Sequence, residues 1–428
     1  MANCELLRSG YEPRDEEVVV VSPTLDTASR LDVISTICQR VLDRAADLED
    51  AAVRLLPFPR QVIRADLALA ASRLEAFATV TPRLAGRRPL GRVALALPGN
   101  AILSNPLATI AASHLAGNKT LVRMPRQRRE WAAVLSALVG EAAEFVDFGG
   151  SGFIDHAMRQ PDVDAIMVFG DDSWAADYEM VARTTGTKFV FEGPGKDPFL
   201  VLCPALVDEA ARAAVEAGMF NAGQACTSPE RFYVVPAAYD DFVERVIDLV
   251  RELNVGDPDD PQTQIGPLAP VVAHRLDAQV RDAISKGAVV LNTGMARPMT
   301  VNGEERVLVP PIVVAGTDHR MTLMREETFG PVIAIQRAAS IHEALELAED
   351  SPYGLSATTF GRVEGVAERL VHSHGQVFAE QTWLSQRRRH PLAPYGGRRR
   401  SGWVWEWQDE QFVRRDGPRH NFLEFSRI

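Results

Sequence analysis

The most informative stretch of this sequence is Phe220-Asn221-Ala222-Gly223-Gln224-Ala225-Cys226-Thr227. It places the Cys226 thiol after an alanine-rich helical segment, in a turn that Gly223 makes conformationally permissive. Upstream lies a second stretch, Phe191-Glu192-Gly193-Pro194-Gly195-Lys196-Asp197-Pro198, which places Glu192 at the end of an apolar strand. A thiol can attack a carbonyl carbon and hold the acyl group as a thioester. A carboxylate can activate the water that releases this group, and Glu192 precedes Cys226 by 226 − 192 = 34 residues.

Strands and helices alternate upstream of these stretches. Apolar runs predict strands at Arg92–Leu97, Thr120–Met124, Phe145–Phe148, Ala165–Phe169 and Lys188–Glu192. Helices are predicted between them, at 106–116, 130–143, 154–159 and 173–184. Before this series we expect a strand at Glu17–Ser22 and helices at Thr27–Leu56 and Arg60–Ala78. Continuously apolar strands that alternate with helices favour an α/β fold with a doubly wound parallel sheet.

A second α/β series begins at Pro198. We expect strands at 199–203, 232–235, 331–336 and 356–360, and helices at 208–219, 239–253, 341–348 and 363–372. The boundary between the two series falls near 193–198. Glu192 and Cys226 are therefore expected on opposite sides of an interdomain cleft, which is a common position for a binding site.

Composition excludes several classes of protein. A chain of 428 residues favours two or three domains, and 46% hydrophobic with 24% charged residues is ordinary for a soluble enzyme. The net charge of −11 argues against nucleic-acid binding. The four cysteines show no metal-ligand spacing and indicate reduced thiols. No signal peptide and no apolar run of about 20 residues is present, so we expect a cytoplasmic protein without membrane or metal partners.

The two stretches resemble motifs of the aldehyde dehydrogenase superfamily, which has "E-L-G-G-K" and "F-x-N-x-G-Q-x-C" at this separation. Four further segments are similar to motifs of that family in the same order, and the resemblance covers about residues 91 to 402. They are Ala96-Leu97-Pro98-Gly99-Asn100, Leu115-Ala116-Gly117-Asn118-Lys119-Thr120, Glu326-Glu327-Thr328-Phe329-Gly330-Pro331-Val332, and Pro394-Tyr395-Gly396-Gly397-Arg398-Arg399-Arg400-Ser401-Gly402. The last of these is similar to the family pattern "P-F-G-G-x-K-x-S-G".

This resemblance implies a fold and a reaction. It implies two doubly wound parallel-sheet domains with a small oligomerisation element, and oxidation of an aldehyde to a carboxylic acid with NAD(P). Cys226 would be the nucleophile, Glu192 the general base for thioester hydrolysis, and Asn100 the oxyanion donor. Two alternatives stay open: an acyl-transferring or thioester-reducing enzyme that uses coenzyme A or a carrier thiol, and a non-catalytic scaffold. The presence of Glu192 argues against the former, because family members that transfer to coenzyme A typically lack this Glu.

The resemblance also implies a dinucleotide site, with departures at its adenosine end. The family usually has "K-P-S-E" where this chain has Met124-Pro125-Arg126-Gln127, so two ribose contacts are absent. Guanidinium groups pair well with phosphate. Arg126, Arg128 and Arg129 therefore favour NADP over NAD, unless "RQRRE" is only a solvated helix start.

The nicotinamide end is implied by Gly170, Glu327 and Phe329. Gly170 stands where the family has "G-S-T", and Asp171 and Asp172 after it favour helix capping. Glu327 resembles the residue that holds the nicotinamide ribose, and Phe329 the one that packs beside the nicotinamide. Lys196 is expected to be structural.

Domain limits and partners complete the expectations. We expect a dinucleotide-binding domain at 1–193 with a short oligomerisation hairpin at about 79–91, a catalytic domain at 194–402, and an oligomerisation tail at 403–428. The tail ends in a strand-like segment, 422–428, and favours a homodimer. Arg387, Arg388 and Arg389 lie near the expected channel mouth, where they either receive an acidic substrate or carrier, or form a solvated loop.

Overall fold

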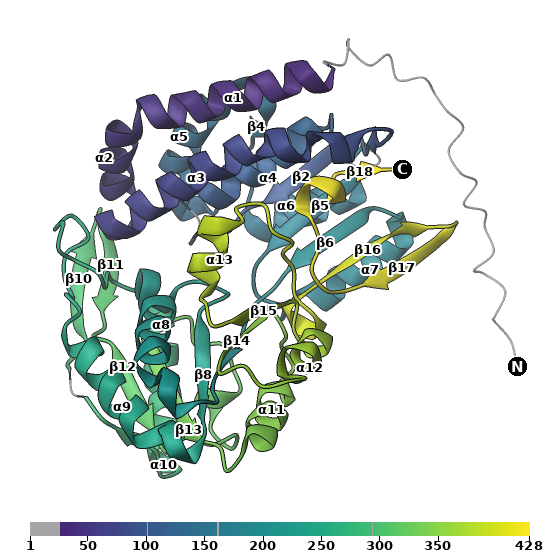
Figure 1. Cartoon of the computed structure of the whole chain (residues 1–428). Helices are drawn as coiled ribbons and strands as arrows, with labels where there is room; N and C mark the ends of the chain where they lie inside the picture. Colours follow the sequence, from purple (N-terminus) through teal and green to yellow (C-terminus); the bar gives the residue numbers. More distant parts are fainter. Residues whose placement is uncertain (1–25, 101, 161, 293) are drawn as a thin grey trace, which may run out of the picture.

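Two seven-stranded sheets organise the chain (Figure 1). The computed structural model describes residues 26–100, 102–160, 162–292 and 294–428, so the strand expected at 17–22 lies outside the described residues. The first sheet has the order β17-β16-β6-β5-β2-β3-β4. Its strands are β2 (Arg92–Ala96), β3 (Lys119–Arg123), β4 (Glu144–Phe145), β5 (Ala165–Phe169), β6 (Lys188–Glu192), β16 (Gly402–Gln408) and β17 (Gln411–Arg415).

Helices cover both faces of this first sheet, as a doubly wound fold requires. One face is covered by α1 (Thr27–Asp43), α3 (Arg60–Val80), α4 (Ser104–Leu115) and α5 (Arg129–Val139), with α2 (Ala45–Leu55) beside α3. The other face is covered by α6 (Gly150–Arg159) and α7 (Ala175–Thr185). The long segment expected as one helix, 27–56, divides into α1 and α2 at Arg44. None of the helices in the described part of the chain has the length and apolar character that crossing a bilayer requires.

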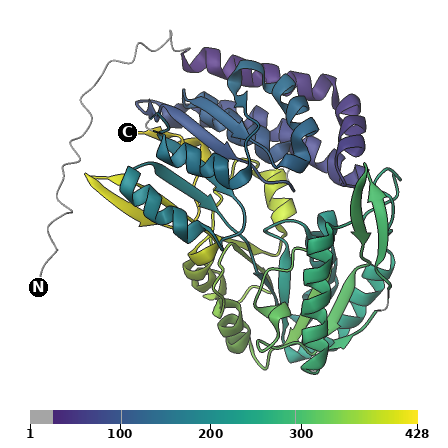
Figure 2. The ribbon, with the colours of Figure 1, turned by 180° about the vertical axis from the view of Figure 1, so that it is seen from behind.

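The second sheet has the order β15-β14-β7-β8-β13-β12-β9, and it forms the second body (Figures 1 and 2). Its strands are β7 (Asp197–Val201), β8 (Pro229–Val234), β9 (Val289–Val290), β12 (Ile312–Ala315), β13 (Val332–Arg337), β14 (Ser356–Phe360) and β15 (Gln376–Ala379). The helices around it are α8 (Val207–Met219), α9 (Pro236–Arg251), α10 (Pro270–Ser285), α11 (Ile341–Glu349) and α12 (Val366–Ser373). Pro236 and Pro270 each occupy the first position of their helix, where a missing N–H costs no hydrogen bond.

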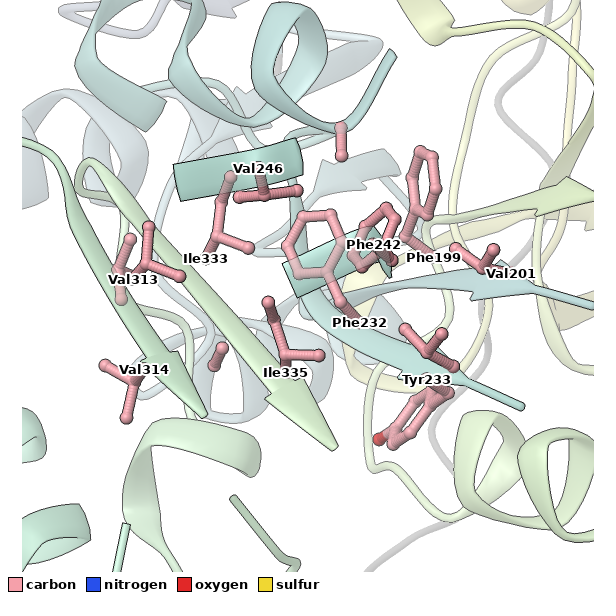
Figure 3. Close-up of a cluster of buried hydrophobic side chains, with 14 of the residues drawn as sticks. Phe199, Val201, Phe232, Tyr233, Phe242, Val246, Val313, Val314, Ile333 and Ile335 are labelled. Atoms are coloured by element: carbon pink, nitrogen blue, oxygen red, sulfur yellow. The ribbon is translucent and has the colours of Figure 1, made fainter. Parts of the chain in front are cut away.

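The core of the second body is built from the central strands. Phe199 of β7 packs against Phe232 of β8 with ring centroids 5.3 Å apart. Ile333 and Ile335 of β13 lie beside them, and Phe242 of α9 covers them (Figure 3). All five side chains are buried. Sequence patterns do not predict α10, the hairpin β10 (Arg297–Val301) and β11 (Glu304–Leu308), or the short helix α13 (Trp383–Arg389).

The hairpin expected at about 79–91 is absent from the structure. Helix α3 continues to Val80, a 3-10 turn spans Thr81–Leu84, and β1 is only Arg88–Pro89. β1 pairs antiparallel with β18 (Ser426–Arg427) near the chain end. Half of the strand expected at 422–428 is instead a helical turn, α14 (Asn421–Glu424). Residues 79–84 are helical and β1 pairs with β18, so the segment does not form a hairpin and this expectation is wrong.

The segment expected as a separate oligomerisation tail, 403–428, joins the first body instead. β16 pairs antiparallel with β6, with Gly402 opposite Glu192, and β17 pairs with β16. Trp403 is buried against Phe189 and Phe191, with ring centroids 4.9 Å and 5.1 Å away. Burial of these aromatic rings explains why the chain returns to this sheet. Contacts of this segment with a second subunit stay a prediction.

The two bodies meet where β6 leads into β7 through the turn Gly193–Lys196. The carboxyl end of β6 therefore faces the amino ends of β7 and β8. A side chain on Gly195 would place its Cβ 2.0 Å from the Cys226 carbonyl oxygen. Only glycine allows this turn to touch the turn that carries Cys226.

A buried ion pair holds the loops around this junction together. Lys196 Nζ lies 2.6 Å from Glu230 Oε2, and both side chains are almost inaccessible to solvent. Glu230 also accepts hydrogen bonds from the backbone N–H groups of Thr328 and Phe329, at 2.8 Å and 2.7 Å. Lys196 is therefore structural, and the pair fixes the loop that carries Glu327 and Phe329.

Breaking this pair should destabilise the protein strongly. Glu230→Gln leaves the Lys196 ammonium buried without a counter-charge, and we expect a loss of about 3–5 kcal/mol in the free energy of unfolding. Asp155→Asn is the matched control, because it breaks an exposed i,i+4 pair with Arg159 that contributes little. Urea unfolding midpoints measure both effects. Equal midpoints for the two variants would contradict the structural role of the buried pair.

Candidate active site

A cavity of about 380 Å³ lies between the two bodies, and residues of both line it. The first body contributes Asn100 after β2, Gly170 after β5, and Glu192 at the end of β6. In the first sheet the strand order reverses between β2 and β5, and ligands of doubly wound folds bind at such switch points. The second body contributes Cys226 after α8 and Glu327 before β13.

Cys226 follows a turn with unusual backbone geometry. Asn221, Ala222 and Gly223 have φ values of 52°, 55° and 72°, in the left-handed region that non-glycine residues rarely adopt. A Cβ on Gly223 would lie 2.2 Å from the Gly330 carbonyl oxygen, so this position requires glycine. The Cys226 Sγ lies 3.0 Å from the Tyr395 hydroxyl. Burial raises the pKa of the Cys226 thiol to about 11, although Arg387 and the Tyr395 hydrogen bond lower it.

Asn100 lies beside this turn. Its Nδ2 donates a hydrogen bond to the Gln224 carbonyl at 3.2 Å, which brings the amide next to the loop that carries Cys226. The neighbouring Gly99 carbonyl accepts a hydrogen bond from Arg128 Nε at 3.1 Å. The expected oxyanion donor and the expected nucleophile therefore line the same cavity.

Glu192 is buried at the end of β6. Its Oε1 lies 2.5 Å from Arg419 Nη2, and the side chains of both residues are at most 2% exposed. Its Oε2 is buried and has no hydrogen-bond partner among the described residues. Burial raises the pKa of Glu192 to about 7, and the Arg419 charge opposes this rise. A carboxyl with a pKa near neutrality can exchange a proton under physiological conditions.

Glu327 and Phe329 also line the cavity. Glu327 Oε1 accepts a hydrogen bond from the Gly195 N–H at 2.9 Å. Burial and the nearby Glu230 raise the pKa of Glu327 to about 8. Phe329 has a φ of 58°, and its N–H is bonded to Glu230. The Gly170 N–H donates to the Glu192 carbonyl at 3.1 Å, which joins the ends of β5 and β6.

The residues expected at the adenosine end lie outside the lining of this cavity. Met124 is buried in the core of the first body, Pro125 is half-buried, and Arg126 and Gln127 are exposed in a 3-10 turn at the end of β3. Arg128 is not available to a phosphate, because its guanidinium is buried over the Phe58 ring at 5.6 Å from the ring centre. Arg129 is exposed and paired with Asp147. Arg126 is therefore the arginine of this turn that a ligand could reach.

The two acids after Gly170 have separate roles. Asp171 Oδ1 accepts from the Ser173 N–H at 2.8 Å, which closes a turn before α7. Asp172 forms an ion pair with Arg400. The Asp171 side chain therefore bonds a backbone N–H just before the helix, which confirms part of the expected capping. The Asp172 side chain pairs with Arg400 instead, so the expectation of side-chain capping is wrong for Asp172.

Four residues that sequence reasoning did not assign to catalysis touch the site or its reacting groups. Arg73, Arg387 and Tyr395 line the cavity, and Arg419 contacts Glu192. Tyr395 was visible as a departure from the "P-F-G-G" pattern, and Arg387 as part of a charge run. Arg73 on α3 and Arg419 near the chain end carry no sequence signal, because nothing local relates them to Cys226 or Glu192.

Arg387, Arg388 and Arg389 separate in space. Arg387 and Arg388 line the cavity. Arg388 is exposed and pairs with Glu216 at 3.2 Å, whereas Arg389 is exposed and bonds to Gln381. The segment is the helix α13 and not the expected loop, and of the three only Arg389 is exposed and outside the cavity lining.

Comparisons with known proteins agree with this geometry. The sequence matches the model of the aldehyde dehydrogenase family over residues 24–413. It is 32% identical over 327 residues to "Succinate-semialdehyde dehydrogenase [NADP(+)] 1" of Mycobacterium bovis, which covers 74% of this chain and 69% of that protein.

Solved structures share the fold. An NADP-dependent enzyme of Escherichia coli superposes with a TM-score of 0.84 at 22% identity, covering 94% of this chain and 85% of the other. An NAD-dependent aldehyde dehydrogenase of Sinorhizobium meliloti superposes with a TM-score of 0.83 at 24% identity, covering 95% and 82%. The chain belongs to the aldehyde dehydrogenase family, and it oxidises aldehydes with NAD(P).

Proposed function

We propose that the protein oxidises an aldehyde that also bears an acid group, through a thioester on Cys226 that water hydrolyses. The observation that carries this proposal is that the cavity containing Cys226 is also lined by Arg73 and Arg387. The name of the relative from Mycobacterium bovis, a succinate-semialdehyde dehydrogenase, supports the same substrate class.

Arg387 is held where it can reach a substrate bound near Cys226. Its Nη2 donates to Thr227 Oγ1 at 3.3 Å, next to the nucleophile in the sequence. Its guanidinium lies over the Trp383 ring at 4.6 Å from the centre, and 5.7 Å from that of Tyr395. Such stacking orients the guanidinium and leaves its edge for an anion.

Arg73 approaches the cavity from α3 in the other body. Its Nε is buried and has no hydrogen-bond partner among the described residues. Burial and the charge of Arg387 lower the pKa of Arg73 to about 10, so the two guanidinium groups repel each other. A bound carboxylate would relieve this repulsion and satisfy the unpaired donor.

The residues of the site can divide the first half-reaction among them. The Cys226 sulfur bonds to the aldehyde carbon as the thiol loses its proton to solvent, and the electron pair of the carbon–oxygen π bond moves to the oxygen, which becomes negatively charged. Asn100 Nδ2 has a second hydrogen to donate, and together with the Cys226 N–H it would stabilise this oxygen. A bound nicotinamide dinucleotide would supply the hydride acceptor that the conversion of this adduct to a thioester on Cys226 requires.

Hydrolysis then needs a base. A water oxygen bonds to the thioester carbon, and the proton of the water passes to Glu192. The carbon–sulfur bond breaks, its electron pair returns to Cys226 as the thiolate, and the product leaves as a carboxylic acid that ionises in solvent. Glu192 lines the cavity, and its Oε2 has no hydrogen-bond partner among the residues that the structure describes, so it fits this role.

The chemistry of the lining also fits the nicotinamide end of NADP or NAD. The Glu327 carboxylate suits ribose hydroxyls, and Phe329 offers an apolar face beside it. At the adenosine end Arg126 and Gln127 replace the usual contacts, and we propose that Arg126 favours the 2′-phosphate of NADP.

We further propose that the protein forms a homodimer in the cytoplasm. The two-stranded ribbon of β1 and β18 leaves strand edges for a second copy. This feature supports assembly at this end of the chain.

The nucleophile is tested by Cys226→Ala. We expect aldehyde oxidation to fall below about 1% of wild type, since no other group in the site can form the thioester. The dissociation constant for the dinucleotide, measured by nicotinamide fluorescence, should change little. Cys203→Ala is the control and should keep full activity. Substantial oxidation by Cys226→Ala would exclude the thioester mechanism.

The substrate class is tested by Arg387→Met. Losing one charge-assisted contact should raise KM for a four-carbon semialdehyde roughly ten- to a hundredfold, and leave KM for butanal unchanged. Arg389→Met, which removes an exposed arginine outside the cavity, is the matched control. Steady-state kinetics with both aldehydes decide the question, and an equal effect on the two would contradict an acid-binding role.

Cofactor preference is tested by Arg126→Ala. Wild type should bind NADP more tightly than NAD, and the variant should lose roughly ten- to a hundredfold of NADP affinity with NAD affinity retained. Arg129→Ala serves as the control, because Arg129 is paired with Asp147. If both variants keep the wild-type ratio of dissociation constants, this turn does not select the phosphate.

A further inference from the structure

An antiparallel β-bridge joins Tyr395 and Arg419. Each residue donates its backbone N–H to the carbonyl of the other, at 2.8 Å in both directions. Tyr395 follows α13, and Arg419 precedes α14. The side chains of these two residues contact the two proposed reacting groups, one each. The bridge therefore links the surroundings of the nucleophile to those of the base.

Tyr395 contacts the nucleophile. Its hydroxyl lies 3.0 Å from Cys226 Sγ, and it lies in the wall of the cavity. Burial raises the pKa of Tyr395 well above its usual value, so this phenol keeps its proton and can donate it in a hydrogen bond. The Phe of the family pattern could not make this contact.

Arg419 contacts the base. Its Nη2 lies 2.5 Å from Glu192 Oε1 and also donates to the Phe191 carbonyl at 3.3 Å. Its Nη1 donates to the Gly417 carbonyl at 3.3 Å. The guanidinium is thus anchored on two backbone carbonyls. It engages one carboxylate oxygen of Glu192, while the other oxygen has no partner in the described part of the chain.

We propose that the Tyr395–Arg419 bridge is part of the catalytic apparatus of this protein. The Tyr395 hydroxyl donates a hydrogen bond to the Cys226 sulfur when it carries negative charge, which makes Tyr395 a catalytic residue. Arg419 acts through Glu192 as a positioning residue, because it holds this carboxylate in one orientation and favours its ionised form. The inference rests on the proposed roles of Cys226 and Glu192.

The charges around Glu192 fix the direction of the pH effect. Arg419 faces Glu192 with a positive charge that favours the ionised carboxylate. The negative charge of Glu424 on α14 disfavours it, and the Tyr395 phenol carries no positive charge. Burial already raises the pKa of Glu192 to about 7. Without Arg419 this pKa must rise further, so the carboxyl would hold its proton at neutral pH. Hydrolysis would then require a higher pH, because the base works only when ionised.

The groups around Cys226 act on the pKa of its thiol in a similar way. Arg387 and Tyr395 favour the thiolate, while burial, Glu327 and Asp197 disfavour it. Removing the Tyr395 hydroxyl should raise the pKa of the thiol. Alkylation of Cys226 by iodoacetamide should then move to higher pH.

The experiment uses p-nitrophenyl acetate, which acylates a reactive thiol without any dinucleotide or aldehyde. The burst of nitrophenolate reports acylation of Cys226, and the steady rate reports hydrolysis of the acyl-enzyme. In Arg419→Gln we expect a full burst, with a steady rate at pH 7 reduced about tenfold and an acid limb shifted upward by about one pH unit or more. Arg419→Lys should recover part of the shift, since it restores the charge.

Tyr395→Phe tests the proposed role of the Tyr395 hydroxyl, because this substitution removes only that group. We expect the burst rate constant to fall about tenfold, with the iodoacetamide profile of Cys226 shifted to higher pH and the acid limb of hydrolysis in its wild-type position. Arg414→Gln, which removes a surface arginine of β17 paired with Glu179 at 3.7 Å, is the matched control and should behave as wild type.

The outcomes separate this inference from the proposed function. A burst that persists in Cys226→Ala would overturn the proposed nucleophile. If Cys226→Ala abolishes the burst but Arg419→Gln keeps the wild-type pH profile, the positioning role of Arg419 is wrong, even if the steady rate of Arg419→Gln is reduced. An unshifted alkylation profile in Tyr395→Phe would likewise overturn the role of Tyr395.

Discussion

The buried ion pair between Lys196 and Glu230 is the interaction on which the site depends. Glu230 lies on β8, Lys196 lies in the turn that connects the two bodies, and their contact pins this turn to the second sheet. The same carboxylate accepts the N–H groups of Thr328 and Phe329, so the wall that carries Glu327 is fixed to the same point. A buried charge without its partner costs several kcal/mol, which makes alternative arrangements of these loops unfavourable.

Burial shifts the pKa values of several ionisable groups of the cavity, in opposite directions for acids and bases. It raises the pKa of Glu192, Glu327 and the Cys226 thiol, and it lowers the pKa of Arg73. Each shift disfavours the charged form in a low dielectric. The arginines on the cavity and beside it offset this effect for the carboxylate and the thiol, so the balance between burial and guanidinium charge sets the reactivity of the site.

Much of the first body was predictable from local pattern. The bounds of β5 and β6 match their apolar runs, and the helices between the parallel strands occur in the expected order. The β16–β17 hairpin was not predictable, since its pairing with β6 depends on Trp403 packing against Phe189 and Phe191 across more than 200 residues of chain. The division of the 27–56 segment into α1 and α2 was not predictable either, because a break at Arg44 leaves the helical periodicity almost unchanged.

By itself the sequence determined the parallel α/β architecture, the glycine-dependent turns, and the presence of Asn100, Glu192 and Cys226. Periodicity, turn chemistry and motif spacing are local properties, so they are legible without coordinates. Only the tertiary structure decided that Arg128 is buried over Phe58, that Arg387 faces the cavity while Arg389 does not, and that Arg419 meets Glu192 from 227 residues away. These choices depend on helix phase and on contacts between distant segments, which packing of the whole chain settles.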